Sequence, residues 1–286
     1  MIDVSVILPA FNEEQAIGDD LDRIKEAMES SPYTFEIIVV DDASTDRTAE
    51  IAAGKGVTVI SHRRNKGSGG SRKTGIRAAR GRFIAMCDAD GSYPIGDIPT
   101  LVGYLPEYDL VVGARKEEKG THKVMRSLAK FIIRKLAEFL TGREIPDLNT
   151  GLMAFKRELI TNYLYLIPNG FSCTSTISLI HLTNGYDVKY VPIDYYKRIG
   201  KSKFHPFKDT SKYLLTVIRI TSHFNPLKVF ITVSGIVLGA AVIKSLLDIA
   251  LLGTLEESDV ILFLAAIIIG ALGIIADLIV TQGRRD

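Results

Sequence analysis

Two long apolar stretches near the C-terminus constrain this chain most. Residues 229–252 and 260–280 are predominantly apolar, and as helices each is long enough to cross roughly 30 Å of hydrocarbon. They contribute to an apolar content of 47%, which is high for a soluble protein. Little chain remains to bury them as core helices. We therefore expect a membrane domain over 229–286, preceded by a juxtamembrane amphipathic helix and linker over 205–228 and a larger domain over 1–204.

The charges around the two apolar stretches predict their orientation. The loop between them, GTLEESD, is acidic, whereas the outer flanks carry Lys228, Arg284 and Arg285. Cytoplasmic flanks of membrane spans are enriched in Lys and Arg. We therefore expect a multi-pass cell-membrane protein whose N-terminal domain and C-terminus lie in the cytoplasm. The formal net charge of +2 is too small to indicate a partner.

The first two hundred residues alternate between strand-like and helix-like segments. Helical patterns occupy 13–30 and 45–54. Short β-branched runs, which predict strands, cover 4–9, 35–42, 57–60, 82–88 and 109–115. Such alternation predicts an α/β fold with a mostly parallel sheet and helices on both faces. Ligands bind such sheets beyond the carboxyl ends of the strands.

Asp88 and Asp90 follow one of these strands directly, in FIAMCDADGSYP. Two carboxylates this close raise each other's pKa unless a positive charge lies between them. Oxygen ligands suit Mg²⁺ or Mn²⁺, which complete their shells with water and substrate phosphate. The alternative is a loop that merely starts with two solvated acids.

Other polar residues also follow predicted strand ends. A parallel sheet would gather them with the paired acids along one edge, which favours a binding site, although a buried structural network is the alternative. These residues are Pro9, Asn12, Glu13, Asp41 and Asp42.

Residues 62–81, HRRNKGSGGSRKTGIRAARG, combine glycines with basic residues. Glycine allows the backbone to approach a ligand closely, and Arg and Lys bind phosphate. The spacing matches neither a Walker loop nor a dinucleotide fingerprint. We expect no nucleic-acid partner, since the aromatic residues that stack on bases are absent here.

Two basic segments come before the apolar stretches. Residues 122–142 have the pattern of a basic amphipathic helix, which fits either the lipid surface or packing on the sheet. Residues 195–209, YYKRIGKSKFHPFKD, carry cations that could hold lipid head groups or a phosphate.

In this order the motifs resemble those of the family 2 glycosyltransferases, and among them the polyprenyl-phosphate (dolichyl-phosphate) hexose synthases. The chain is similar to dolichyl-phosphate mannose synthases and polyisoprenyl-phosphate glucosyltransferases over residues 4 to about 204. The matching motifs are VILPAFNEE, IIVVDDASTD, NKGSGGSRKTGI, DADGSYP, VVGAR, DLNTGLMAFKRE and RIGKSKF.

The resemblance implies a glycosyltransferase A-type domain that binds a nucleoside-diphosphate hexose, with UDP or GDP, and Mg²⁺ or Mn²⁺. Asp88 and Asp90 would hold the metal, with Asp90 the more direct ligand. Ser92 stands where dolichyl-phosphate mannose synthases often have glutamine, so the identity of the hexose stays open. The residues that would bind the donor are Pro9, Asn12, Glu13, Asp41, Lys66, Gly67, Arg72 and Lys201.

The resemblance also implies the reaction. An oxygen of a polyprenyl or dolichyl phosphate would attack the anomeric carbon with inversion, so no strong base is required. Arg115, Arg126 and Arg198 would hold the acceptor phosphate, because the planar guanidinium binds phosphate oxygens in pairs. Asp147 would lie near the reaction centre as an orienting or weakly basic group.

Three other functions compete with this interpretation. A processive polysaccharide synthase would use a tryptophan-containing acceptor motif, and this chain has no tryptophan. A dehalogenase-type phosphatase also ends a strand in Asp-x-Asp-Gly, but it needs a further acidic pair downstream. A membrane-anchored sugar-nucleotide-binding or regulatory subunit would not need the arginines that hold the acceptor phosphate.

The first apolar stretch also contains Gly235 and Gly239 in a Gly-x-x-x-Gly step, and the second contains Gly270 and Gly273. Small residues let membrane helices approach closely. We expect a homo-oligomer packed through these spans. The alternative is that the glycines serve only the hairpin within one chain.

Overall fold

The structure, a computed structural model, describes residues 2–116, 124–170, 172–198 and 206–282. The chain divides into two compact units, Met1–Val217 and Ile218–Asp286. The boundaries 1–204, 205–228 and 229–286 stay predictions.

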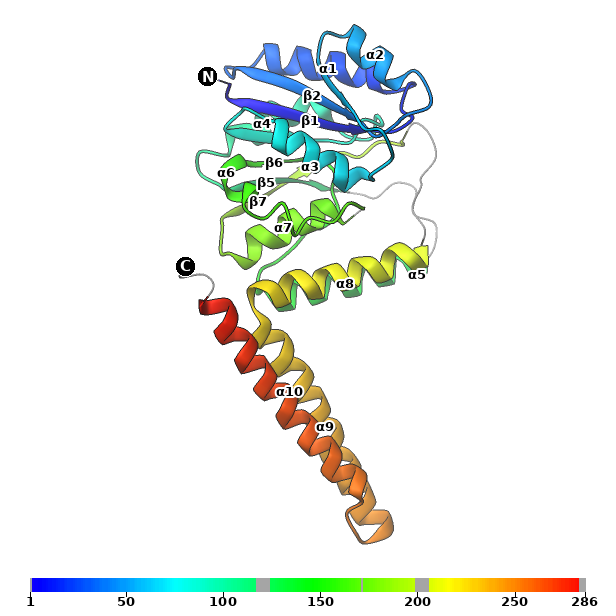
Figure 1. Cartoon of the computed structure of the whole chain (residues 1–286), viewed down its shortest axis with the longest axis vertical. Helices are drawn as coiled ribbons and strands as arrows, with labels where there is room; N and C mark the ends of the chain where they lie inside the picture. Colours follow the sequence, from blue (N-terminus) through cyan, green and yellow to red (C-terminus); the bar gives the residue numbers. More distant parts are fainter. Residues whose placement is uncertain (1, 117–123, 171, 199–205, 283–286) are drawn as a thin grey trace. The chain divides into compact units, whose positions relative to one another are not determined.

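The first unit is built on a mixed sheet (Figure 1). Within the described residues the strand order is β3-β2-β1-β4-β6-β5-β7. The strands are β1 (Val4–Ala10), β2 (Phe35–Asp41), β3 (Thr58–Ser61), β4 (Phe83–Met86), β5 (Leu110–Arg115), β6 (Met153–Lys156) and β7 (Val188–Ile193). Only β6 runs antiparallel to its neighbours among these strands, which confirms a mostly parallel sheet.

The helices of this unit alternate with the strands along the chain. They are α1 (Ile17–Glu29), α2 (Thr48–Gly54), α3 (Ser68–Ala78), η1 (Ile95–Asp97), α4 (Ile98–Gly103), α5 (Val124–Thr141), α6 (Arg157–Thr161), α7 (Cys173–Thr183) and α8 (Pro206–Phe224). The last of these, α8, continues into the second unit.

Alternate residues of β1 show that helices cover both faces of the sheet. Val6 and Leu8 belong to one apolar core with Leu21 of α1. Ile7 points to the other face, where α3 packs so closely that a Cβ on Gly75 would lie 2.4 Å from Ile7 Cγ2. Successive side chains of a strand point to opposite faces, so α1 and α3 lie on opposite sides. The predicted α/β architecture is confirmed.

The sequence patterns missed two strands, β6 and β7. Both lie in the second half of the sheet, and β6 has a consequence for the site. Met153 begins β6 and pairs with Met86 at the end of β4. Because β6 is antiparallel, the residues just before it lie at the carboxyl edge of the parallel strands.

Helix α5 confirms the amphipathic helix predicted within residues 122–142, and one side of it packs against the protein. Ile133, Ala137 and Leu140 are buried at helical spacing. Phe131 and Ile132 are about half exposed. Packing on the first unit therefore accounts for one stripe of the helix, and contact of the exposed stripe with lipid stays a prediction.

The second unit contains the antiparallel hairpin of α9 (Pro226–Leu252) and α10 (Glu257–Gln282) (Figure 1). Both helices are long and apolar enough to span a membrane, and little of either is buried within the protein. They match the predicted spans 229–252 and 260–280. Ser234 of α9 donates its hydroxyl to the Ala266 carbonyl of α10 (2.7 Å), and a Cβ on Gly273 would lie 2.5 Å from Phe230 Cβ.

Candidate functional site

The ends of β1 and β2 form one side of the candidate site. Asn12 adopts a left-handed backbone conformation (φ 57°), which asparagine tolerates better than most residues. Its N–H donates to Ser44 Oγ (3.0 Å), and its Oδ1 accepts the Thr45 N–H (2.8 Å). The Ser44 N–H in turn donates to Asp41 Oδ1 (3.2 Å). Thus the structure brings the predicted residues Asn12 and Asp41 together.

Pro9 and Glu13, also predicted at this edge, lie beside them. Pro9 pairs with Val40 in the register of β1 and β2. The Glu13 N–H donates to Thr48 Oγ1 (2.8 Å), which fixes the loop between β1 and α1 against the start of α2.

Asp42, which the sequence places at this edge without a role, is buried and anchors backbone of the glycine-rich segment. Its Oδ1 accepts the Lys66 N–H and its Oδ2 accepts the Gly67 N–H, both at 2.8 Å. His62 Nδ1 lies 2.7 Å from Asp42 Oδ1, and His62 Nε2 lies 2.9 Å from Thr74 Oγ1. Asp42 therefore holds the start of the glycine-rich segment to the end of β2.

The glycines of this segment approach protein backbone. Gly67 has φ 83°, and a Cβ on it would lie 2.4 Å from the Asn169 carbonyl oxygen. That same oxygen accepts the N–H groups of Gly69 (2.9 Å) and Gly70 (3.2 Å) at the start of α3. The close approach that the glycines permit is thus made to the loop around Asn169, and binding of donor by Lys66 and Gly67 stays a prediction.

Each of the paired acids meets an arginine. Arg72, buried on α3, donates from Nη2 to Asp88 Oδ1. Arg198, which follows β7, donates from Nε to Asp90 Oδ2. Asp90 Oδ1 accepts the N–H (3.0 Å) and the hydroxyl of Ser92. From the sequence we expect a cation to relieve the repulsion between the acids, and the structure shows that two arginines already do so.

Asp147 and Arg115 form a third acid–arginine pair at this edge. Arg115 ends β5, and Asp147 lies in the loop that the antiparallel β6 brings there. Arg115 Nε and Nη2 donate to the two Asp147 oxygens at 2.7 and 2.9 Å. Burial alone would raise the pKa of Asp147, but the hydrogen bonds and charge of Arg115 outweigh it and hold that pKa below its usual value.

Tyr93 connects the loop of the paired acids to the loop before β6. Its hydroxyl accepts the Gly151 N–H (2.6 Å), and its ring meets Tyr195 edge-on at 5.2 Å between centroids. Gly151 has no room for a side chain, because a Cβ would lie 2.4 Å from Asp88 Oδ2. Sequence alone assigned neither Tyr93 nor Gly151 a role, although both belong to the quoted motifs DADGSYP and DLNTGLMAFKRE.

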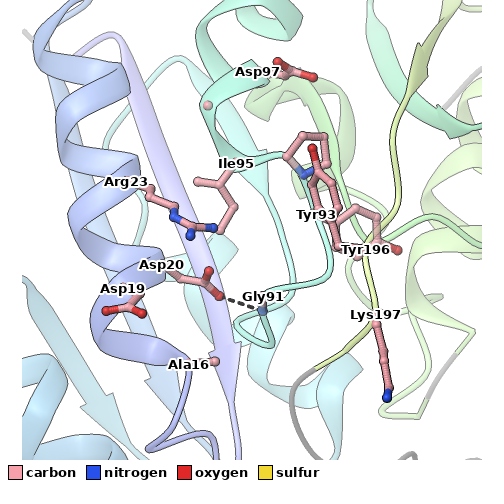
Figure 2. A pocket seen from close by; sticks show the side chains of 12 residues that line it. Ala16, Asp19, Asp20, Arg23, Gly91, Tyr93, Ile95, Asp97, Tyr196 and Lys197 are labelled. Carbon is pink, nitrogen blue, oxygen red and sulfur yellow. Dashed lines mark hydrogen bonds between the residues drawn. The ribbon is translucent and has the colours of Figure 1, made fainter.

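A pocket of about 600 Å³ lies beside the same loop. Figure 2 shows Asp20 of α1 facing Gly91, with Arg23 on the same helix and Tyr196 and Lys197 across from them. Asp20 Oδ2 accepts the Gly91 N–H (3.0 Å). Burial raises the pKa of Asp20 to about 6; the Gly91 N–H opposes this rise and the charge of Asp90 adds to it. The signal for Asp20 in the sequence was an acid on the apolar stripe of its helix.

Two predicted site residues cannot be placed. Lys201 and the side chain of Arg126 lie outside the described part of the chain. The predicted residues that the structure gathers at the carboxyl edge are Pro9, Asn12, Glu13, Asp41, Lys66, Gly67, Arg72, Asp88, Asp90, Arg115, Asp147 and Arg198.

Residues 5–164 match the family described as glycosyl transferase family 2. The chain belongs to glycosyltransferase family 2. Residues 225–281 match a second family, the GtrB C-terminal hairpin, which coincides with α9 and α10.

Two curated relatives carry names that include a lipid phosphate. The dolichyl-phosphate hexose transferase of Haloferax volcanii is 30% identical over 224 residues, covering 76% of this chain and 93% of that protein. The dodecaprenyl-phosphate galacturonate synthase of Rhizobium johnstonii is 34% identical over 167 residues, covering 56% and 49%.

Solved glycosyltransferases share the fold. Glucosyl-3-phosphoglycerate synthase from Mycobacterium tuberculosis, crystallised with Mn²⁺, UDP and glucosyl-3-phosphoglycerate, has a TM-score of 0.57 and 22% identity. The match covers 77% of this chain and 80% of that one. At this identity the likeness shows the fold alone.

The site suits a divalent cation that takes some of its ligands from the protein and the others from a bound substrate. The described residues contain no group of three or more His, Cys, Asp or Glu side chains that could hold a metal unaided. Asp88 and Asp90 supply two carboxylates, and the absence of a side chain at Gly151 lets the Asp88 carboxylate lie against that residue. Mg²⁺ and Mn²⁺ are suited to such a site, because they take further oxygens from phosphates and water.

Proposed function

We propose that this family 2 glycosyltransferase transfers a hexose, with inversion, from a nucleoside-diphosphate hexose to a polyprenyl or dolichyl phosphate. The observation that carries the proposal is the row of three acid–arginine pairs at one sheet edge, Arg72–Asp88, Arg198–Asp90 and Arg115–Asp147. A site for two phosphorylated substrates needs both the acids for a cation and the arginines for phosphate. The names of the relatives agree with a lipid-phosphate acceptor.

In this mechanism the donor lies at the ends of β1, β2 and β4. Asn12 and Asp41 would face the nucleoside, and Asp88 and Asp90 would hold Mg²⁺ or Mn²⁺. When bound, that ion neutralises charge on the leaving diphosphate. The bond from the anomeric carbon to the diphosphate breaks with its electron pair on the diphosphate, and a lipid-phosphate oxygen forms the new bond from the opposite side.

Arg115 and Arg198 orient the acceptor phosphate in this mechanism. An ionised phosphate oxygen is already a nucleophile near neutral pH, so no side chain has to remove a proton. Asp147 fixes the Arg115 guanidinium through both of its oxygens and orients it without becoming protonated. The product is a hexose joined to the lipid through one phosphate.

The experiment is transfer of radiolabel by the purified full chain. A panel of labelled UDP- and GDP-hexoses is incubated with Mn²⁺ or Mg²⁺ and polyprenyl phosphate, and label entering the organic phase is counted. We expect one donor to label the lipid, and excess chelator or Asp90→Asn to abolish the reaction in a folded protein. Full activity in chelator, or near-normal turnover of Asp90→Asn, would contradict the metal assignment.

We also infer that α9 and α10 span the cell membrane with the catalytic unit and the C-terminus in the cytoplasm. Support comes from Lys228 and the C-terminal arginines, against the acidic loop between the spans. Single cysteines placed in that loop should react with a membrane-impermeant maleimide from outside intact cells, whereas cysteines near Lys228 should not.

A homo-oligomer packed through α9 is the last part of the proposal. Gly270 and Gly273 lie against side chains of α9, as the intrachain alternative expects. A Cβ on Gly235 or Gly239 would meet nothing within 4 Å, so the α9 surface that carries these two glycines could contact a second copy of the chain. Gly235→Leu with Gly239→Leu should lower the mass on light scattering, whereas Ala240→Leu, about 100° round the helix, should not. An unchanged mass would leave only the intrachain role.

A further inference from the structure

Asp90 has protein partners on both of its carboxylate oxygens. The side chain is 1% exposed. Oδ1 accepts the N–H and the hydroxyl of Ser92, and Oδ2 accepts hydrogen bonds from Arg198. A carboxylate that binds a cation must direct an oxygen at it. One of the two partners must therefore leave Asp90 before it can act as a metal ligand.

The partner that can leave is Arg198. Ser92 is fully buried and lies two residues along the same loop, so its hydrogen bonds are fixed by the fold of that loop. The Arg198 side chain is 33% exposed. By contrast, the Arg72 side chain, which pairs with Asp88, is 4% exposed within α3. The two arginines thus differ: Arg72 is a permanent counter-ion and Arg198 is replaceable.

We propose that Arg198 is an exchangeable counter-ion that couples donor binding to acceptor binding. It neutralises Asp90 while the donor site is empty. The cation and donor diphosphate displace it, and the freed guanidinium then binds the acceptor phosphate. This inference rests on the proposed function, since it takes Asp90 as a metal ligand.

The surroundings of Arg198 suit such an exchange. Its segment crosses the loop of the paired acids, where the Tyr196 N–H donates to the Ser92 carbonyl (2.9 Å). Beside this crossing lies the pocket of about 600 Å³, which Tyr196 and Lys197 help to line (Figure 2). The segment therefore has space next to it. The Arg115 guanidinium carbon lies 5.2 Å from the ring centroid of Tyr195, three residues before Arg198, so the Arg198 segment passes beside the second arginine that we propose for the acceptor phosphate.

Exchange has a thermodynamic consequence. While Arg198 holds Asp90, a cation must compete with a guanidinium, which weakens its apparent affinity. If the freed Arg198 binds phosphate, then the cation and donor strengthen phosphate binding, and phosphate strengthens theirs by the same factor. The acceptor would accordingly bind well only after the donor.

The test measures Mn²⁺ binding without turnover, by the electron paramagnetic resonance signal of free Mn²⁺. In Arg198→Ala we expect affinity for Mn²⁺ to rise at least about fivefold, the lower end of usual couplings between sites. Arg198→Gln, which keeps a hydrogen-bond donor for Asp90, is the second variant in case the first does not fold. Lys197→Ala is the matched control, because it removes a neighbouring exposed cation that has no contact with Asp90 among those described.

The outcomes separate this inference from the function beneath it. If the wild type binds no Mn²⁺, with or without UDP or GDP, the metal assignment fails and this inference fails with it. If the wild type binds Mn²⁺ but the Arg198 variants bind it equally or more weakly, or only as much more tightly as Lys197→Ala, the inference alone is overturned. As a second readout, Mn²⁺ with nucleotide should tighten binding of a short-chain polyprenyl phosphate to the wild type, and this gain should vanish in Arg198→Gln.

Discussion

Arg115 and Asp147 meet through two parallel hydrogen bonds, although they are 32 residues apart and come from β5 and the loop before β6. Both side chains are at most 10% exposed. Removing one member of a buried ion pair typically costs about 3–5 kcal/mol, because the other charge is left without a partner. The pair therefore stabilises the part of the site that we propose binds the acceptor phosphate.

Arg115→Lys tests the geometry of this pair. Lysine keeps the charge but cannot make two parallel hydrogen bonds. We expect the apparent KM for the lipid phosphate to rise and the affinity for the nucleotide sugar, measured by calorimetry, to stay close to that of the wild type. An equal loss in both would place Arg115 on the donor side.

Gly151→Ala tests the packing beneath Asp88. The new Cβ would lie 2.4 Å from Asp88 Oδ2, so the carboxylate has to move. We expect affinity for Mn²⁺ with nucleotide to fall about tenfold, which corresponds to about 1.4 kcal/mol. Gly54→Ala is the control, because its Cβ would meet nothing within 4 Å. If both variants bind like the wild type, the position of Asp88 does not matter for the cation.

Asp20→Asn tests the effect of burial on an acid beside the site. The pKa of Asp20 is raised to about 6 in the folded protein from 3.8, so its charged form is disfavoured by folding. The free energy by which ionised Asp20 destabilises the folded protein is zero below about pH 4 and grows as the pH rises. Above about pH 6 it reaches its full value, up to about 3 kcal/mol. Asn removes the charge and keeps an acceptor for the Gly91 N–H.

We therefore expect Asp20→Asn to stabilise the protein at pH 7.5, by a margin that disappears near pH 4. Denaturant unfolding of the detergent-solubilised protein at both pH values measures this. A stabilisation that is the same at both pH values would contradict the pKa assignment.

Lys244→Met tests the polar cluster within the hairpin. Lys244 Nζ binds Asp248 and lies 2.9 Å from Asp259 Oδ1 on the other helix. Without the lysine, two acids share an apolar setting without a cation, which is unfavourable near lipid. We expect a lower midpoint of thermal unfolding in detergent, and a partial recovery when Asp259→Asn is added. No recovery in the double variant would show that the lysine stabilises the hairpin by other means.

The sequence predicted the first half of the sheet well because β1, β2 and β4 are short β-branched runs that end in polar residues. It missed β7 for a physical reason: β7 lies at the edge of the sheet and contains Pro192, which patterns assign to loops. It missed β6 because four residues carry too little periodicity. The antiparallel direction of β6 brings Asp147 to the site. This direction is set by the pairing of strands in the tertiary structure and cannot be predicted from the local sequence pattern.

The site residues likewise divide into those that the sequence predicts and those whose partners only the fold reveals. Strand-end acids were found because parallel strands gather their carboxyl ends, and family motifs gave the arginines. The partners within the site could not be read from spacing, since Arg72 meets Asp88 and Arg198 meets Asp90 only through the fold. The backbone-binding role of Asp42 likewise depends on a loop more than twenty residues away.

The chemical identity of the product tests the central claim most directly. The full chain is incubated with its nucleotide sugar, Mn²⁺ and polyprenyl phosphate, and the lipid product and released nucleotide are weighed by mass spectrometry. The account predicts a lipid that carries one phosphate and one hexose, with release of the nucleoside diphosphate, and no product from the free polyprenol. A lipid diphosphate sugar with release of the nucleoside monophosphate, or an equal yield from polyprenol, would contradict it.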